Sequence, residues 1–119
     1  MMKKDIHAGP TQRCLKVGEE IRRVLASIFQ SYLFADSGIS GASITITEVQ
    51  MSADLGHAKV FMLPLGGTAK EVVLETVRLH GPRLRHFLSK KVQLRHVPAL
   101  DFRLDETFDA FAAINNALK

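Results

Sequence analysis

The chain has 119 residues, the size of a single domain that can bury a substantial hydrophobic core. Hydrophobic residues make up 46% and charged residues 24%, so wholesale disorder is excluded, and no apolar run reaches the roughly 18 residues that a membrane span needs. The formal net charge of +4 favours anionic partners but is too small to identify one.

Residues 1–11 include two lysines but lack the apolar core of a secretory signal. We therefore interpret them as a flexible tail and expect a cytoplasmic protein. The single cysteine, Cys14, cannot form a disulfide within the chain, which agrees with a reducing compartment. We expect its thiol to pack as a small hydrophobe at the start of a helix.

A first amphipathic helix is predicted from about Gln12 to Tyr32. Its apolar side chains recur at helical spacing, and its charged side chains lie on the other side. The charged side provides three candidates for secondary contacts with an RNA partner: Arg13, Lys16 and Arg23. The neighbouring Glu19 and Glu20 weaken the positive field of these cations.

Two strands that form an antiparallel hairpin are predicted after a loop at residues 35–41, where serine, glycine and aspartate favour turns. In the first strand, from Ala42 to Met51, isoleucines alternate with threonines. The second strand runs from His57 to Leu63 and ends at Pro64. The polar connection at residues 52–56 contains a serine and an aspartate, Ser52 and Asp54, whose role we expect to be structural.

A second helix is predicted to follow the diglycine at residues 66–67, with Thr68 as its cap. Its apolar face is expected to consist of Ala69, Val72, Val73 and Val77. The helix should kink or break at His80, Gly81 and Pro82, because proline removes a backbone hydrogen bond and glycine loosens the neighbouring backbone. His80 continues the apolar face, so we expect a partly buried histidine with its hydrogen bonds satisfied.

A third helix is predicted beyond the kink, and it should end near Ser89 or Lys90. We expect it to bury Leu84, Phe87 and Leu88. A last strand lies around residues 97–104, where apolar and charged residues alternate. Residues 108–119 place apolar side chains at helical spacing and predict a C-terminal helical tail.

The predicted order, α-β-β-α-kink-α-β, is that of the type II KH fold, an α+β domain in which helices cover one face of a three-stranded sheet. Several strings then resemble the ribosome-binding factor A family in particular. They are Val17-Gly18-Glu19-Glu20-Ile21-Arg22, Val49-Gln50-Met51-Ser52-Ala53-Asp54-Leu55 with Ala58-Lys59-Val60-Phe61, and Val97-Pro98-Ala99-Leu100-Asp101-Phe102 with Asp105-Glu106-Thr107. The resemblance spans residues 12–107, which we interpret as one KH-like ribosome-binding domain. The family's kink is built around an Ala-x-Gly string, whereas this chain has His80-Gly81-Pro82.

The resemblance implies a ribosome assembly factor that binds the free immature small ribosomal subunit. Such a factor assists late maturation and 5′-end processing of the ribosomal RNA and has a role in cold adaptation. We also expect a monomer that does not bind a membrane, a small-molecule substrate or a cofactor. The alternative is a general KH-like RNA-binding protein or RNA chaperone without a ribosome-specific site. An enzyme is not favoured, because the sequence has no nucleophile elbow, no phosphate-binding loop and no Cys–His nucleophile arrangement.

Basic residues concentrate between Thr76 and Leu100, a stretch without aspartate or glutamate that therefore carries a continuous positive potential. In KH-like recognition, such side chains meet phosphates near an exposed kink. We predict RNA contacts at Arg83, Arg85, His86, Lys90, Lys91 and Arg95. The spacing of the histidines does not match zinc ligands, so no metal site is predicted. With one tyrosine and no tryptophan, stacking platforms for bases are scarce, and we expect recognition to rely on shape and phosphates more than on base contacts.

Overall fold

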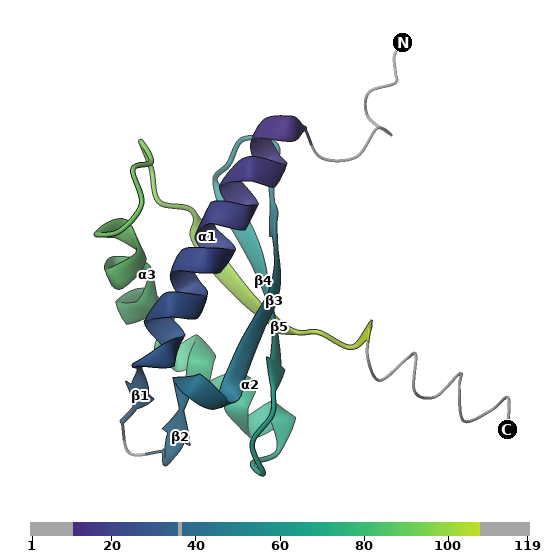
Figure 1. The fold of residues 1–119 in the computed structure, drawn as a ribbon, viewed down its shortest axis with the longest axis vertical. Helices are drawn as coiled ribbons and strands as arrows, with labels where there is room; N and C mark the ends of the chain where they lie inside the picture. Colours follow the sequence, from purple (N-terminus) through teal and green to yellow (C-terminus); the bar gives the residue numbers. More distant parts are fainter. Residues whose placement is uncertain (1–10, 36, 108–119) are drawn as a thin grey trace, which may run out of the picture.

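The computed structural model describes residues 11–35 and 37–107 (Figure 1). The tail expected at residues 1–11, apart from Thr11, and the helical tail expected at 108–119 lie outside the described residues. In the part that is described, no helix combines the length and apolar character required to cross a membrane.

The first helix, α1 (Gln12–Gln30), confirms the predicted amphipathic helix. The hydroxyl oxygen of Thr11 caps it by accepting a hydrogen bond from the backbone N–H of Cys14 at 3.1 Å. Its buried face includes Cys14, which is a free thiol packed as expected, and the fully buried Ile21, Leu25 and Phe29. The helix therefore supplies one wall of the hydrophobic core.

A small two-stranded ribbon follows α1, where the sequence predicted only a loop. It pairs β1 (Leu33–Phe34) with β2 (Ile39–Ser40) in antiparallel register. A short 3-10 turn, η2 (Gly41–Ser43), then leads into the sheet. A Cβ atom at Gly41 would lie 2.2 Å from the carbonyl oxygen of Phe29, so only glycine permits this close approach of the two backbones.

The main sheet has three strands in the order β3-β4-β5. The antiparallel pairing of β3 (Ile44–Met51) with β4 (His57–Pro64) confirms the predicted hairpin, and β5 (Ala99–Leu104) pairs in parallel with β4. The register of β3 shifts between Ile46 and Glu48. This bulge at Thr47 reverses the alternation of faces, so Val49 packs against the core while Glu48 is exposed.

The helices α1, α2 (Lys70–Leu79) and α3 (Gly81–Ser89) lie on one side of the sheet (Figure 1). This arrangement and the element order confirm the α+β, type II KH-like fold. The predicted start and face of α2 were partly wrong. Ala69, not Thr68, stands at the N-cap, and it has no side-chain oxygen to accept a hydrogen bond. Val72 is 52% exposed because it lies one helical step away from the stripe of Val73 and Val77 that meets the sheet.

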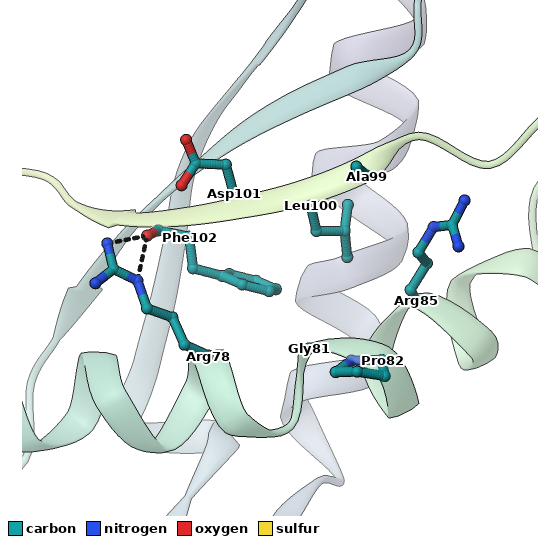
Figure 2. A pocket seen from close by; sticks show the side chains of 8 residues that line it. All are labelled: Arg78, Gly81, Pro82, Arg85, Ala99, Leu100, Asp101 and Phe102. Atoms are coloured by element: carbon teal, nitrogen blue, oxygen red, sulfur yellow. Dashed lines mark hydrogen bonds between the residues drawn. The ribbon is translucent and has the colours of Figure 1, made fainter.

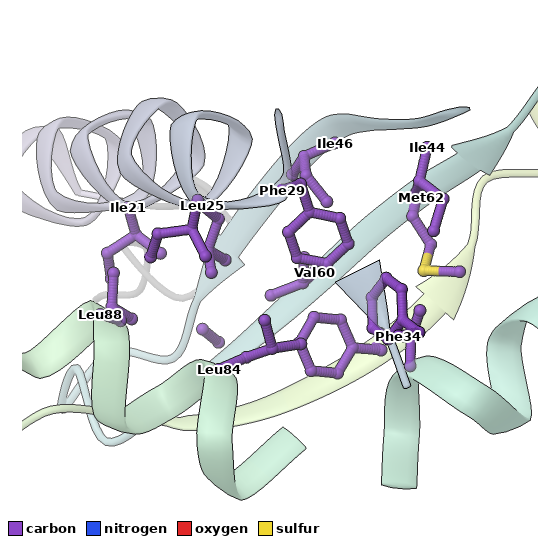
Figure 3. Close-up of a cluster of buried hydrophobic side chains, with 14 of the residues drawn as sticks. Ile21, Leu25, Phe29, Phe34, Ile44, Ile46, Val60, Met62, Leu84 and Leu88 are labelled. Atoms are coloured by element: carbon purple, nitrogen blue, oxygen red, sulfur yellow. The ribbon is translucent and has the colours of Figure 1, made fainter. Parts of the chain in front are cut away.

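Aromatic and aliphatic side chains from every layer meet in a single core (Figure 3). Phe29 packs against Phe34 with ring centroids 5.8 Å apart in an edge-to-face arrangement, which joins α1 to the small ribbon. From α3, Leu84 and Leu88 are completely buried. The expected burial of Phe87 is wrong: its side chain is 39% exposed, because only the i, i+4 pair of this short helix points at the sheet.

A polar contact joins the bulge in β3 to the end of β5. The hydroxyl of Thr47 donates a hydrogen bond to the Oδ2 atom of Asp105 at 2.7 Å, and the backbone N–H of Thr107 donates to Oδ1 at 2.9 Å. These two hydrogen bonds hold the pKa of Asp105 below its ordinary value, and the one from Thr47 has the larger effect. The bulge thereby aims the Thr47 hydroxyl at a group far along the chain.

Acid should weaken this contact in a measurable way. Because the folded pKa of Asp105 lies below its unfolded value, the contact stabilises the fold above about pH 4 and is lost as the pH falls through the folded pKa. Above that pH, Thr47→Val should lower the free energy of unfolding by about 0.5–1.5 kcal/mol. The difference between variant and parent should shrink in acid, as measured by denaturant unfolding from pH 6 downward. Thr45→Val, at an exposed position of the same strand, is the control, and parallel pH curves for Thr47→Val and the parent would contradict the assignment.

Candidate nucleic-acid interface

The chain turns sharply between α2 and α3 at a single residue, His80. Its backbone (φ −90°, ψ 4°) ends one helix and begins the next. Its N–H donates to the carbonyl of Val77 at 3.0 Å, and its carbonyl accepts from the N–H of Leu84 at 2.9 Å. Pro82 stands in the first turn of α3, where its missing N–H costs nothing. The predicted kink is therefore confirmed with His80-Gly81-Pro82 in place of Ala-x-Gly.

The His80 side chain faces inward, as expected for a satisfied, partly buried histidine. Its Nδ1 atom lies 2.7 Å from the hydroxyl oxygen of Tyr32, which follows α1. The imidazole also packs on Phe34, with ring centroids 5.0 Å apart. His80 thus fixes the turn between α2 and α3 to the segment that follows α1.

Two arginines near the turn are held by backbone carbonyls. The Arg78 guanidinium donates two hydrogen bonds to the carbonyl of Phe102, at 3.0 and 3.2 Å. Arg85 donates to the carbonyls of Val97 and Pro98, at 2.6 and 3.0 Å. Sequence reasoning missed these contacts, since no local pattern pairs a helix arginine with a backbone carbonyl 12 to 24 residues along the chain.

A cleft of about 530 Å³ lies between these two arginines, over Gly81 and Pro82 (Figure 2). Both guanidinium groups already have carbonyl partners, and the carboxylate of Asp101 points away from the cleft on the other side of β5, where it pairs with Arg103 at 2.9 Å. An anion here would find that several N–H groups of both arginines are already used by backbone carbonyls. We therefore assign this cleft a structural role, and Arg85 becomes a weaker candidate for phosphate contact than the sequence suggested.

The other predicted RNA contacts are exposed, but they lie on two flanks of α3 instead of one stripe. On the flank that faces α1, Arg83 and Lys91 line a cleft together with Phe87. On the opposite flank, His86 and Arg95 line a second cleft with Arg85. Lys90 is exposed at the end of the helix and lines neither cleft. All six predicted residues lie on α3 or in the segment directly after it, but they do not form one continuous surface.

The secondary candidates on α1, namely Arg13, Lys16 and Arg23, are all exposed. Their field is reduced as expected, because Glu19 pairs with two cations. Arg22 donates two hydrogen bonds to Glu19, at 2.6 and 3.0 Å, and Arg23 lies 4.0 Å from the same carboxylate. These contacts lower the pKa of Glu19, chiefly through the hydrogen bonds from Arg22. Of these three candidates, Arg13 and Lys16 have no carboxylate partner among the described residues.

The turn between β3 and β4 satisfies its own polar groups. The carboxylate of Asp54 accepts hydrogen bonds from the Ser52 hydroxyl at 2.7 Å and from the Gly56 N–H at 2.9 Å, and its pKa is lowered, chiefly by the first. The structural role expected for Ser52 and Asp54 is thereby supported.

Across residues 11–35 and 37–107, no three His, Cys, Asp or Glu side chains gather closely enough to hold a metal ion.

Comparison with known proteins gives one consistent result. A family model described as ribosome-binding factor A matches residues 13–118. Ribosome-binding factor A from Paramagnetospirillum magneticum is 42% identical over 109 residues, covering 92% of this chain and 77% of the relative. The protein of the same name from Ruegeria pomeroyi is 42% identical, covering 92% of this chain and 85% of the relative.

Solved structures agree on the fold. The crystal structure of ribosome-binding factor A from Thermus thermophilus superposes with a TM-score of 0.66 at 22% identity, covering 76% of this chain and 93% of the other. The solution structure of a Thermotoga maritima protein, described as a putative ribosome binding factor A, gives a TM-score of 0.64 at 24% identity and covers 81% of this chain and 90% of the other. A homology model of the Thermus protein, fitted into a cryo-EM map of its complex with the 30S subunit, gives a TM-score of 0.61 at 20% identity. It covers 77% of this chain and 94% of the other.

Proposed function

Because the chain belongs to the ribosome-binding factor A family, we propose that it binds the free immature small ribosomal subunit through ribosomal RNA. In this proposal it assists late maturation and 5′-end processing of that RNA and contributes to growth in the cold. It acts as a cytoplasmic monomer, by binding and not by catalysis. The family name and the 30S complex of the Thermus protein support the ribosomal partner.

The observation that carries the RNA contact is the exposed basic surface of α3. Arg83, Lys90, Lys91 and Arg95 project from this helix and the segment after it, and in the described part of the chain none of them pairs with a carboxylate. Surface cations without acidic neighbours are free to neutralise phosphates. The two flanks of α3 offer such contacts on both sides of one short helix.

Sedimentation of a cell extract through a sucrose gradient tests the proposed partner. We expect this protein to migrate with free small subunits and to be absent from full ribosomes. A competition between purified immature small subunits and unstructured RNA separates a ribosome-specific factor from a general RNA chaperone. Equal binding to both competitors would favour the chaperone.

Binding should also depend strongly on salt. If about four phosphates are neutralised, the logarithm of the association constant should fall against the logarithm of salt concentration with a slope of about −3 to −4, by analogy with duplex DNA. The measurement is a titration of labelled protein against immature subunits at increasing KCl. A slope near zero would show that α3 does not contact phosphates.

A further inference from the structure

The cleft between α1 and α3 combines an aromatic surface with two cations. It has a volume of about 370 Å³, within the range of roughly 300–1,000 Å³ that small ligands occupy. The last turns of α1 contribute Ser27 and Ile28, and the residues after it contribute Ser31, Tyr32 and, in β1, Leu33. Arg83, Phe87 and Lys91 come from α3 and the residues after it. No aspartate or glutamate lines it.

Phe87 is the exposed aromatic side chain in this cleft. It is 39% exposed on a helix whose other large apolar residues, Leu84 and Leu88, are fully buried. The Tyr32 ring stands nearly perpendicular to it, at 71° and 6.1 Å between centroids. Tyr32 is itself held by its hydrogen bond to His80. Phe87 is therefore a supported aromatic platform, since its neighbour is fixed by a second contact.

The charges beside the platform suit a phosphate. Neither Arg83 nor Lys91 has a carboxylate partner within residues 11–35 and 37–107, in contrast to the cleft of Figure 2, where both arginines donate hydrogen bonds to backbone carbonyls. An unpaired nucleotide presents a flat base with an apolar face next to a phosphate. Such nucleotides are recognised by stacking on aromatic rings together with contacts to basic side chains.

We propose that this cleft binds one unpaired nucleotide of RNA, with its base stacked on Phe87 and its phosphate held by Arg83 and Lys91. The inference rests on the proposed RNA-binding function and adds a base contact to it. It gives base contacts more weight than the sequence suggested, because recognition was expected to rely on shape and phosphates more than on bases. A protein side chain in the cleft is the competing occupant, and it would need the apolar surface but neither a planar ring nor the cations.

The test uses two single-stranded probes of about ten nucleotides, a length within common binding-site sizes. One is oligo(A), and the other is a matched oligomer of abasic ribose phosphates. Fluorescence anisotropy with the full chain should show tighter binding of oligo(A). Phe87→Ala should weaken oligo(A) binding about 5- to 100-fold, the loss expected for one stacked base, and should leave binding of the abasic probe unchanged.

Two further variants separate stacking from apolar contact. Phe87→Tyr keeps a ring and should retain oligo(A) binding, whereas Phe87→Leu should lose it as Phe87→Ala does. Leu79→Ala removes an apolar side chain that is 80% exposed on α2, and it should change neither probe. Thermal unfolding confirms that each variant is folded.

Full oligo(A) binding by either Phe87→Leu or Phe87→Ala would overturn the inference, as would equal binding of the two probes by the parent protein. Sedimentation of the same variants with small subunits keeps the two proposals distinguishable. If the Phe87 variants bind oligo(A) normally and the parent still migrates with small subunits, the nucleotide site is wrong and the proposed function stands. If the parent migrates with no ribosomal particle, the proposed function itself fails.

Discussion

Replacement of Leu84 with alanine should lower the free energy of unfolding by about 2–5 kcal/mol. The Leu84 side chain is completely buried in the core drawn in Figure 3, so the truncation leaves a cavity that its neighbours fill only in part. A domain of this size is stabilised by roughly 5–15 kcal/mol, which makes this loss a large fraction of the total. Urea unfolding followed by circular dichroism measures it directly.

Phe87→Ala is the matched control on the same helix. Its ring is partly exposed, so we expect a loss of about 1 kcal/mol, far below the 3–5 kcal/mol typical of a buried phenylalanine. Equal losses at Leu84 and Phe87 would contradict the assignment of Phe87 to the surface. A small loss at Leu84 would contradict its place in the core.

Reversal of charge at Arg83 and Lys90 should weaken binding to immature small subunits at least about tenfold. Each reversal removes one cation that can meet a phosphate and adds a repulsive carboxylate, and the salt slope should become shallower by about two. Stability should change by only about 0.5 kcal/mol per site, because both residues are exposed and have no ion pair among the described residues. Co-sedimentation with purified subunits and thermal unfolding of the Arg83→Glu, Lys90→Glu protein measure the two effects.

Arg22→Glu with Arg103→Glu, which changes the net charge by the same −4 at two arginines already paired with carboxylates, is the control for charge alone. Because both arginines are already paired, their reversal should reduce subunit binding much less than the double change on α3. If the α3 double variant keeps both its melting temperature and its full binding, the basic surface of α3 is an ordinary solvated face and the proposed RNA contact is wrong.

Local patterns in the sequence predicted most of the fold. Pro82 located the break between α2 and α3, and the alternation of isoleucine and threonine located β3. The errors came from effects that depend on neighbours far along the chain. The exposure of Val72 and Phe87 depends on which stripe of each short helix meets the sheet, and spacing alone does not decide this. The bulge at Thr47 is likewise set by pairing with β4.

The candidate site was predicted less completely than the fold. An acid-free stretch was enough to locate the basic surface, because charge is read directly from composition. The same reading gave every arginine equal weight, although Arg85 is held by two carbonyls and Arg83 is not. The exposed ring of Phe87 was missed because phenylalanine at helical spacing is most often a core residue.

The parallel pairing of β5 with β4 has a consequence for how the chain reaches its native state. The register joins Met62 to Leu104, so both α2 and α3 must be synthesised and bridged before this edge of β4 is covered. Contacts between residues so distant in sequence form late, because the entropy lost on closing the loop precedes the free energy gained from the contacts. A nascent chain that has completed the hairpin therefore exposes one open edge of β4, where another strand could add. We expect the arrival of β5 to be the slow step of folding, and the interval before it to be when this protein is most prone to aggregate.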